Sequence, residues 1–231
     1  MKVLDIKSDD LQKFKLINRG AESKIYLYQD KIIKIYENPK DYNIKKIKYL
    51  SLVQKNIKYT KLPYGIVNMD DRFSGCIQQY FYNYNEFNIL NKNVCIYDTI
   101  SYFKLLLKSL EELVQNNIYP VDLFYGNILI SLINKDVQII DLDGNGSVIK
   151  KEHNSKLLQE TLKLYLSTIL ECLYSNDIKD MCFIDYKSLL IKYSFKKEYI
   201  DIIKDKKLSL EFLYEFLEYI KRDNKTLIKK F

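Results

Sequence analysis

One segment near the middle of the chain places three polar side chains at the ends of short apolar stretches. It reads Asp122-Leu-Phe-Tyr-Gly-Asn-Ile-Leu-Ile, then a polar turn, then Val-Gln-Ile-Ile-Asp-Leu-Asp-Gly. An apolar strand buries its backbone in a sheet and leaves the next residue at the rim, so Asp122, Asn127 and Asp141 are expected to converge on one cleft. Magnesium takes hard oxygen ligands from one or two carboxylates, and a further carboxylate can orient an attacking hydroxyl. The segment therefore predicts a magnesium nucleotide site.

The composition is that of a soluble globular chain. Its 231 residues are 47% hydrophobic and 29% charged, which is enough for a sizeable core. The net charge of +7 comes mainly from lysines spread along the sequence, and the only guanidinium groups are those of Arg19, Arg72 and Arg222. Proteins that read nucleic acid usually cluster arginines as well, so a nucleic-acid partner is not expected.

Neither a zinc site nor a membrane segment is expected. The four cysteines form no Cys-x-x-Cys pair, and His153 is the only histidine. The chain has no run of about 18 apolar residues, and its N-terminus lacks the apolar stretch of a signal peptide. We expect a cytoplasmic protein without a membrane partner.

The first third of the chain predicts a five-stranded antiparallel sheet with one helix. β-Branched and aromatic residues indicate strands within 14–36, and two more strand candidates, 62–68 and 73–81, flank a polar turn at 69–72. Residues 41–55 place apolar side chains on one face of a helix and lysines on the other.

The pattern then changes to long helices. Apolar residues recur at helical spacing in 100–114, 158–173 and 210–220, and Pro120 prevents continuation of the first of these helices. The whole predicts an α+β fold in a single domain of two lobes, with a cleft between them that holds a ligand. The predicted first lobe, hinge region and helical lobe are residues 1–81, 82–88 and 89–231.

The pattern Asp122-Leu-x-x-x-Asn127-Ile-Leu, followed by Ile-Ile-Asp141-Leu-Asp143, resembles the catalytic loop and metal motif of the protein-kinase-like superfamily. The pair Gly126-Asn127 is similar to aminoglycoside and choline phosphotransferases. By this resemblance Asp122 is the catalytic group that orients or deprotonates the acceptor hydroxyl, and Asn127 and Asp141 bind magnesium. Asp143 is either a further metal ligand or a turn residue.

The N-terminal loop Gly20-Ala21-Glu22-Ser23-Lys-Ile-Tyr resembles the nucleotide loop of the Bud32 and RIO atypical kinases. The chain is thus similar to a small atypical kinase of bacterial type. The resemblance implies that Gly20, Ala21, Glu22 and Ser23 bind the nucleotide, because a small residue lets backbone N–H groups approach phosphates. An ordinary hairpin is the alternative.

Lys34 resembles the lysine of the third strand in that superfamily, which pairs with the nucleotide phosphates and supports catalysis. Strand alternation places Ile32 on the same face, where it is positioned to pack on an adenine ring. By analogy, the crossover around Gln79 and Phe81 supplies backbone groups to the adenine. The alternatives are an edge-strand lysine that faces water and simple aromatic packing.

The chain departs from the superfamily at two places. Pro120-Val121 stands where His followed by Arg or Gly is common, and the predicted helix offers lysines where a glutamate usually pairs with the lysine of strand three. Three arrangements are open for Lys34: Asp41 is repositioned to meet it, Glu22 supplies the counter-charge, or Lys34 is unpaired.

The segment after Gly144 is short, lacks Ala-Pro-Glu and reaches a helix expected to begin at Ser155, so regulation by its phosphorylation is not expected. The expected function is that of an ATP- and Mg²⁺-dependent kinase, similar to protein Ser/Thr kinases, that acts on a hydroxyl-bearing protein or small molecule. The alternatives are a small-molecule phosphotransferase and a pseudokinase that serves as a nucleotide-binding scaffold.

Overall fold

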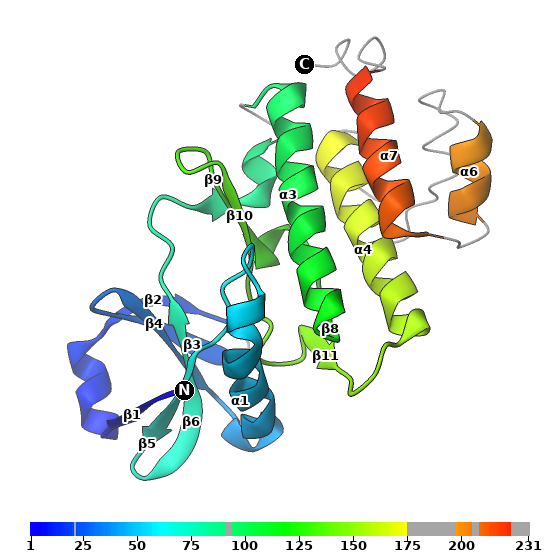
Figure 1. Ribbon diagram of the computed structural model, residues 1–231. Helices are drawn as coiled ribbons and strands as arrows, with labels where there is room; N and C mark the ends of the chain where they lie inside the picture. Colours follow the sequence, from blue (N-terminus) through cyan, green and yellow to red (C-terminus); the bar gives the residue numbers. More distant parts are fainter. Residues whose placement is uncertain (21, 91–93, 175–196, 205–207, 223–231) are drawn as a thin grey trace.

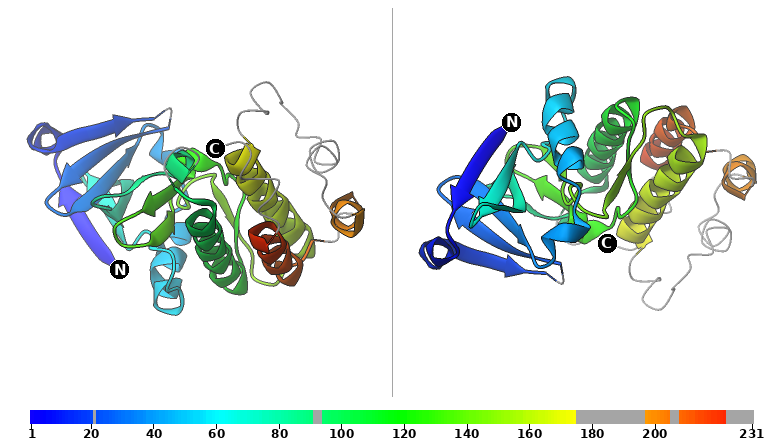
Figure 2. Two further views of the ribbon diagram at one scale, coloured as in Figure 1. Left: turned by 90° about the horizontal axis from the view of Figure 1, so that it is seen from above. Right: turned by 90° about the horizontal axis from the view of Figure 1, so that it is seen from below.

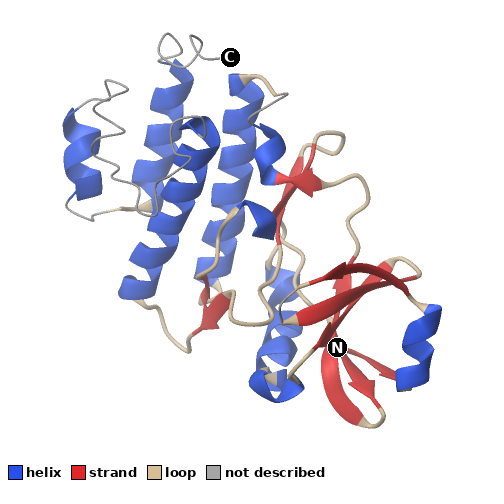
Figure 3. Ribbon diagram, turned by 180° about the vertical axis from the view of Figure 1, so that it is seen from behind, coloured by secondary structure: helices blue, strands red, loops and turns tan. Residues whose placement is uncertain are grey.

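Strands gather in one lobe and long helices in the other (Figure 1, Figure 3). This computed structural model describes residues 1–20, 22–90, 94–174, 197–204 and 208–222. Seen from above and below, the blue strands of the first lobe and the helices of the second lie at opposite sides of the molecule (Figure 2). The α+β class expected from the sequence is confirmed.

Six strands form the sheet of the first lobe, in the order β1-β5-β6-β4-β3-β2. All neighbours are antiparallel except β1 and β5, which pair in parallel. The bounds of the strands are β1 Lys2–Ile6, β2 Lys15–Arg19, β3 Ser23–Tyr28, β4 Lys31–Tyr36, β5 Gly65–Met69 and β6 Arg72–Gln79.

The expectation of a five-stranded antiparallel sheet was wrong, because β1 adds a sixth strand in parallel orientation. Most side chains of β1 are exposed, so its apolar alternation is weak. Its partner β5 lies far along the chain, and a parallel pair requires a long connection instead of a local turn. No local pattern could indicate this pairing.

Local rules explain the turns and the helix of the first lobe. Asp70 and Asp71, in the predicted turn between β5 and β6, have positive φ angles of 51° and 63°, which suit the tight turn of a hairpin. Helix α1 (Ile44–Val53) begins later than the predicted residue 41, because the side chain of Asn43 accepts a hydrogen bond from the backbone N–H of Lys45 at 2.9 Å and so caps the helix.

Gly75 allows strands β4 and β6 to approach each other beside Lys34. A Cβ atom at this position would lie 1.9 Å from the carbonyl oxygen of Lys34. We therefore expect Gly75→Ala to lower the free energy of unfolding by about 1–3 kcal/mol, measured by urea unfolding. Gly20→Ala is the matched control, since its Cβ would meet no atom closer than 3.7 Å. Equal stability of the two variants would contradict this account of Gly75.

The second lobe is built on α3, which contributes Phe103, Leu106 and Leu110 to the main core. Tyr165 of α4 and Phe216 of α7 are fully buried in the same core. Its helices are α3 Ile96–Gln115, α4 Ser155–Tyr174, α6 Lys197–Lys204 and α7 Leu210–Arg222, and its strands are β7 Asn85–Glu86, β8 Ile118–Pro120, β9 Ile128–Ser131, β10 Asp136–Ile139 and β11 Ser147–Ile149. Within the described part of the chain, no helix has both the length and the apolar character needed to cross a bilayer.

Candidate active site

A cleft of about 700 Å³ opens between the two lobes. Its lining comes from β2 to β4 and the loop that follows β2, from the end of β6 and the crossover after it, and from the segment between β8 and β11. The size is within the range of small-ligand sites. The residues that line it are Ile17, Asn18, Gly20, Glu22, Ser23, Ile25, Ile32, Lys34, Gln78, Gln79, Tyr80, Phe81, Asp122, Phe124, Gly126, Asn127, Leu129, Ile140, Asp141, Asn145 and Gly146.

Most of the residues predicted from the sequence to form the site meet in this cleft. Ala21 lies outside the described residues, and Asp143 is not part of the lining. The predicted residues that the structure brings together are Gly20, Glu22, Ser23, Ile32, Lys34, Gln79, Phe81, Asp122, Asn127 and Asp141.

A short turn positions Asp122 and Asn127. The 3-10 turn Tyr125–Asn127 leads into β9, and the Asn127 side chain donates from Nδ2 to the backbone oxygen of Asp122 at 2.9 Å and to its Oδ2 at 3.1 Å. Among the described residues nothing donates to Asn127 Oδ1. Gly126 gives the ring of Phe124 room, because a Cβ there would lie 2.7 Å from it. The turn thus places one carboxylate and one amide side chain in the lining of the cleft.

Asp141 follows β10 in a left-handed backbone conformation, with φ at 63°. This conformation is uncommon for a residue with a side chain, and such strain clusters at functional sites. Gly146 makes the bend possible, since a Cβ there would lie 2.2 Å from the carbonyl oxygen of Asp141. The Asp141 side chain is 40% exposed and opens on the cleft.

The oxygen atoms of Asp141 and Asn127 fit magnesium. The described residues contain no group of three or more His, Cys, Asp or Glu that could hold a metal by themselves. Magnesium needs no such cage, because it usually binds one or two carboxylates and takes its other ligands from water and phosphate. Asp141 and Asn127 both line the cleft, and their carboxylate and amide groups match that donor set.

Lys34 is paired with two carboxylates, so none of the three arrangements proposed for it from the sequence is found. Its ammonium contacts Asp141 Oδ1 and lies 3.3 Å from Asp143 Oδ2. Burial disfavours the charged form, but the charges of Asp143 and Asp141 outweigh this effect and raise the pKa of Lys34 above its usual value. Glu22 instead accepts a hydrogen bond from the Tyr42 hydroxyl at 2.7 Å.

The apolar end of the cleft includes residues that the sequence interpretation missed. Ile25 lines the cleft from the first lobe beside the predicted Ile32, and Leu129 and Ile140 line it from the second lobe. A signal was present, since alternation along the strand that follows Asn127 puts Leu129 on the face opposite to the buried Ile128. These four side chains are apolar, a type that commonly lines small-ligand sites.

The comparison with solved structures agrees with this architecture. The structure of the Cydia pomonella granulovirus kinase PK-1 superposes with a TM-score of 0.56 at 15% sequence identity, over 84% of this chain and 88% of that one. The fold is kinase-like. No protein-family model and no curated protein matches the sequence. The similarity of the Gly20 loop to the Bud32 and RIO kinases stays a prediction.

The helix of the first kinase-like lobe contributes a lysine that holds the loop after Asp143, outside the lining of the cleft, and the sequence interpretation missed this contact as well. Lys46 of α1 donates to the backbone oxygen of Ser147 at 2.6 Å and to that of Gly144. Burial lowers the pKa of Lys46 to about 8, although the charges of Asp143 and Asp141 oppose this. Helix periodicity placed Lys46 on a solvated face, and the loop that covers it is remote in sequence.

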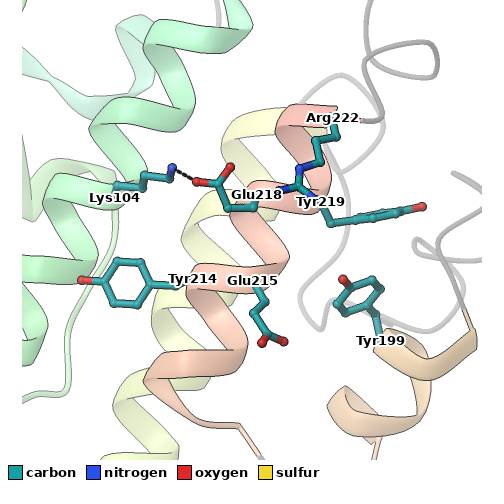
Figure 4. A pocket seen from close by; sticks show the side chains of 7 residues that line it. All are labelled: Lys104, Tyr199, Tyr214, Glu215, Glu218, Tyr219 and Arg222. Carbon is teal, nitrogen blue, oxygen red and sulfur yellow. Dashed lines mark hydrogen bonds and ion pairs between the residues drawn. The ribbon is translucent and has the colours of Figure 1, made fainter.

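Another cavity, of about 680 Å³, lies in the helical part of the kinase-like fold between α3, α6 and α7 (Figure 4). Lys104 of α3 points toward Glu218 of α7 and forms an ion pair with it. The ring centroids of Tyr199 and Tyr219 lie 4.9 Å apart. This cavity shares no residue with the cleft between the lobes.

Proposed function

We propose that this protein is an ATP- and Mg²⁺-dependent kinase that transfers the γ-phosphoryl group to a hydroxyl group. The observation that carries the proposal is that Lys34 of the first lobe and Asp122, Asn127 and Asp141 of the second line one cleft. Phosphoryl transfer depends almost entirely on positioning and on the stabilisation of charge. These side chains offer a cation for the phosphates, oxygen ligands for a metal and a carboxylate for the acceptor.

Each of these residues has one role in the proposed reaction. Asn127 and Asp141 hold magnesium, which supplies positive charge next to the phosphates. Lys34 donates hydrogen bonds to phosphate oxygens. Asp122 accepts the proton of the acceptor hydroxyl while the hydroxyl oxygen bonds to the γ-phosphorus. The bond from that phosphorus to the bridging oxygen breaks, and its electron pair leaves with ADP.

The acceptor is proposed as a hydroxyl of a protein or of a small molecule. The exposed ring of Phe124, 47% accessible, lies in the cleft together with Asp122. An aromatic ring beside the carboxylate can pack on a side chain or on a sugar ring. Incubation with labelled ATP, once with a cell extract and once with a pool of small hydroxyl compounds, decides between the two classes of acceptor.

Thermal unfolding with magnesium ATP tests the nucleotide site. A ligand at 100 times its dissociation constant stabilises the folded state enough to raise the Tm of a chain of this size by about 5–10 °C. We expect such a shift for the wild type and a much smaller one for Lys34→Met, which lacks the cation for the phosphates. The control is Lys40→Met, because Lys40 is exposed and outside the cleft.

Two results would contradict the proposal. The absence of any shift for the wild type at millimolar ligand excludes a nucleotide site. A shift without transfer to any acceptor, including water, supports the pseudokinase scaffold in place of the kinase.

A further inference from the structure

Asp143 differs from Asp141 in its surroundings, although only Leu142 separates them. The side chain of Asp143 is 0% exposed, whereas that of Asp141 is 40% exposed. A magnesium ligand in a nucleotide site must leave room for water and phosphate at the metal. Asp141 lines the cleft and has this room, whereas Asp143 is not in the lining.

Both carboxylate oxygens of Asp143 are already occupied by protein donors. Oδ2 accepts a hydrogen bond from the Tyr36 hydroxyl at 2.7 Å, and Oδ1 accepts one from Gln78 Nε2 at 2.9 Å. Lys34 Nζ lies 3.3 Å from Oδ2 and 3.4 Å from Oδ1. A buried carboxylate is stable only when it is paired and hydrogen-bonded in this way. Its donors come from β4 and β6, so it is attached to the sheet of the first lobe.

We propose that Asp143 is a positioning residue, the permanent counter-charge of Lys34, and that Asp141 is the carboxylate that turns to the metal. This rests on the proposed kinase function. It assigns to Asp143 the task that a helix glutamate performs in the superfamily the sequence resembles.

In that superfamily the helix carries the anion that pairs with the lysine of strand three. Here the helix carries the cation and the loop after β10 carries the anion. Helix α1 has lysines at positions 45, 46 and 48 and brings a cation, Lys46, to the backbone oxygens of Gly144 and Ser147. The same loop brings an anion, Asp143, to Lys34 on strand β4. The three elements are thus still linked, and the loop supplies the anion in place of the helix.

This arrangement explains why Lys34 has two carboxylate partners. When Asp141 turns to a metal, Lys34 loses one of them. Asp143 still holds the ammonium in place, so the cation is already positioned where the phosphates bind.

The test compares Asp143→Asn with Asp141→Asn by calorimetric titration of ADP, first with EDTA and then over a range of magnesium concentrations. For Asp143→Asn we expect at least about tenfold weaker binding of metal-free ADP, because Lys34 is pulled toward Asp141. Magnesium is expected to change the affinity for ADP, and the magnesium concentration at which half of this change is reached should stay within about twofold of the wild-type value. Asp141→Asn is expected to show the reverse, with the magnesium effect lost and metal-free binding retained.

Two outcomes overturn the proposal. If Asp143→Asn abolishes the magnesium effect as Asp141→Asn does, Asp143 is a metal ligand. If Asp143→Asn only lowers the Tm and changes neither binding measurement, Asp143 is merely structural. A wild type that binds no nucleotide contradicts the proposed function itself, which separates the two failures.

A double variant keeps the test decisive if Asp143→Asn folds poorly. Of its two carboxylate partners, the buried ammonium of Lys34 keeps only the partly exposed Asp141 in Asp143→Asn, whereas removal of both members of a buried ion pair is far less harmful. We therefore expect Lys34→Met combined with Asp143→Asn to have a higher Tm than Asp143→Asn alone. A double variant that is no more stable than Asp143→Asn shows that Asp143 does not serve as the counter-charge of Lys34.

Discussion

Replacement of Asp122 by asparagine is expected to lower the rate of phosphoryl transfer by about 10²–10⁴-fold, the range that a general base contributes. Asparagine keeps the shape of the side chain and an oxygen that can accept the hydrogen bond from Asn127, but it cannot take the proton of the acceptor. Binding of magnesium ADP should change by less than about twofold, because Asp122 is assigned to the acceptor and not to the phosphates. Transfer from labelled ATP and calorimetric titration measure the two effects.

Asp9→Asn is the matched control for Asp122→Asn. Asp9 is also exposed, and it lies in the short turn Ser8–Lys13, outside the cleft. Its replacement should leave both transfer and binding unchanged. Wild-type transfer by Asp122→Asn would show that another group is the base.

Replacement of Asp141 by asparagine is expected to reduce transfer by at least about 10³-fold, since a bound metal contributes several kcal/mol to the stabilisation of the transition state. An asparagine oxygen carries no charge and holds magnesium poorly. The loss should equal that caused by EDTA in the wild type, and EDTA should have no further effect on the variant. Transfer assays with EDTA and with increasing magnesium measure the loss of transfer in the variant and its dependence on the metal.

The fold should tolerate this change, because Lys34 keeps Asp143 as a partner when Asp141 loses its charge. We expect the Tm of Asp141→Asn to lie within about 4 °C of the wild type. If transfer by this variant retained the magnesium dependence of the wild type, Asp141 would not be the metal ligand. The same Asp9→Asn control applies.

Sequence patterns predicted the features that depend on neighbouring residues. Pro120 indicated that the long helix ends before it, and α3 ends at Gln115. Helix α4 begins at the predicted Ser155. The alternation of β4 put Ile32 and Lys34 on one face, and both line the cleft. Strand alternation, helix periodicity and the φ of proline act within a few residues, so a local reading is sufficient for them.

Features that join distant parts of the chain were not predictable in this way. Strand β1 pairs with β5, which lies far along the sequence of the first lobe. The expected five-stranded sheet did not include β1. Lys46 had the pattern of a surface residue, yet two backbone oxygens of a remote loop accept its hydrogen bonds. Such contacts depend on how the elements pack against one another. Helix periodicity shows which face of a helix is apolar, but not which remote segment covers the other face.

The sequence by itself determined which chemical groups the cleft contains. The order of Asp122, Asn127 and Asp141 around short apolar strands predicts that they meet, and alternation along its strand puts Lys34 on the same face as Ile32. Only the tertiary structure decided how the two acidic groups of the Asp-Leu-Asp motif differ. Asp143 and Lys34 are 109 residues apart, and they meet because β4 packs on the loop after β10 and removes both from water. Desolvation depends on every surrounding atom, so the same residue type serves as an open metal-facing group at 141 and as a buried counter-charge at 143.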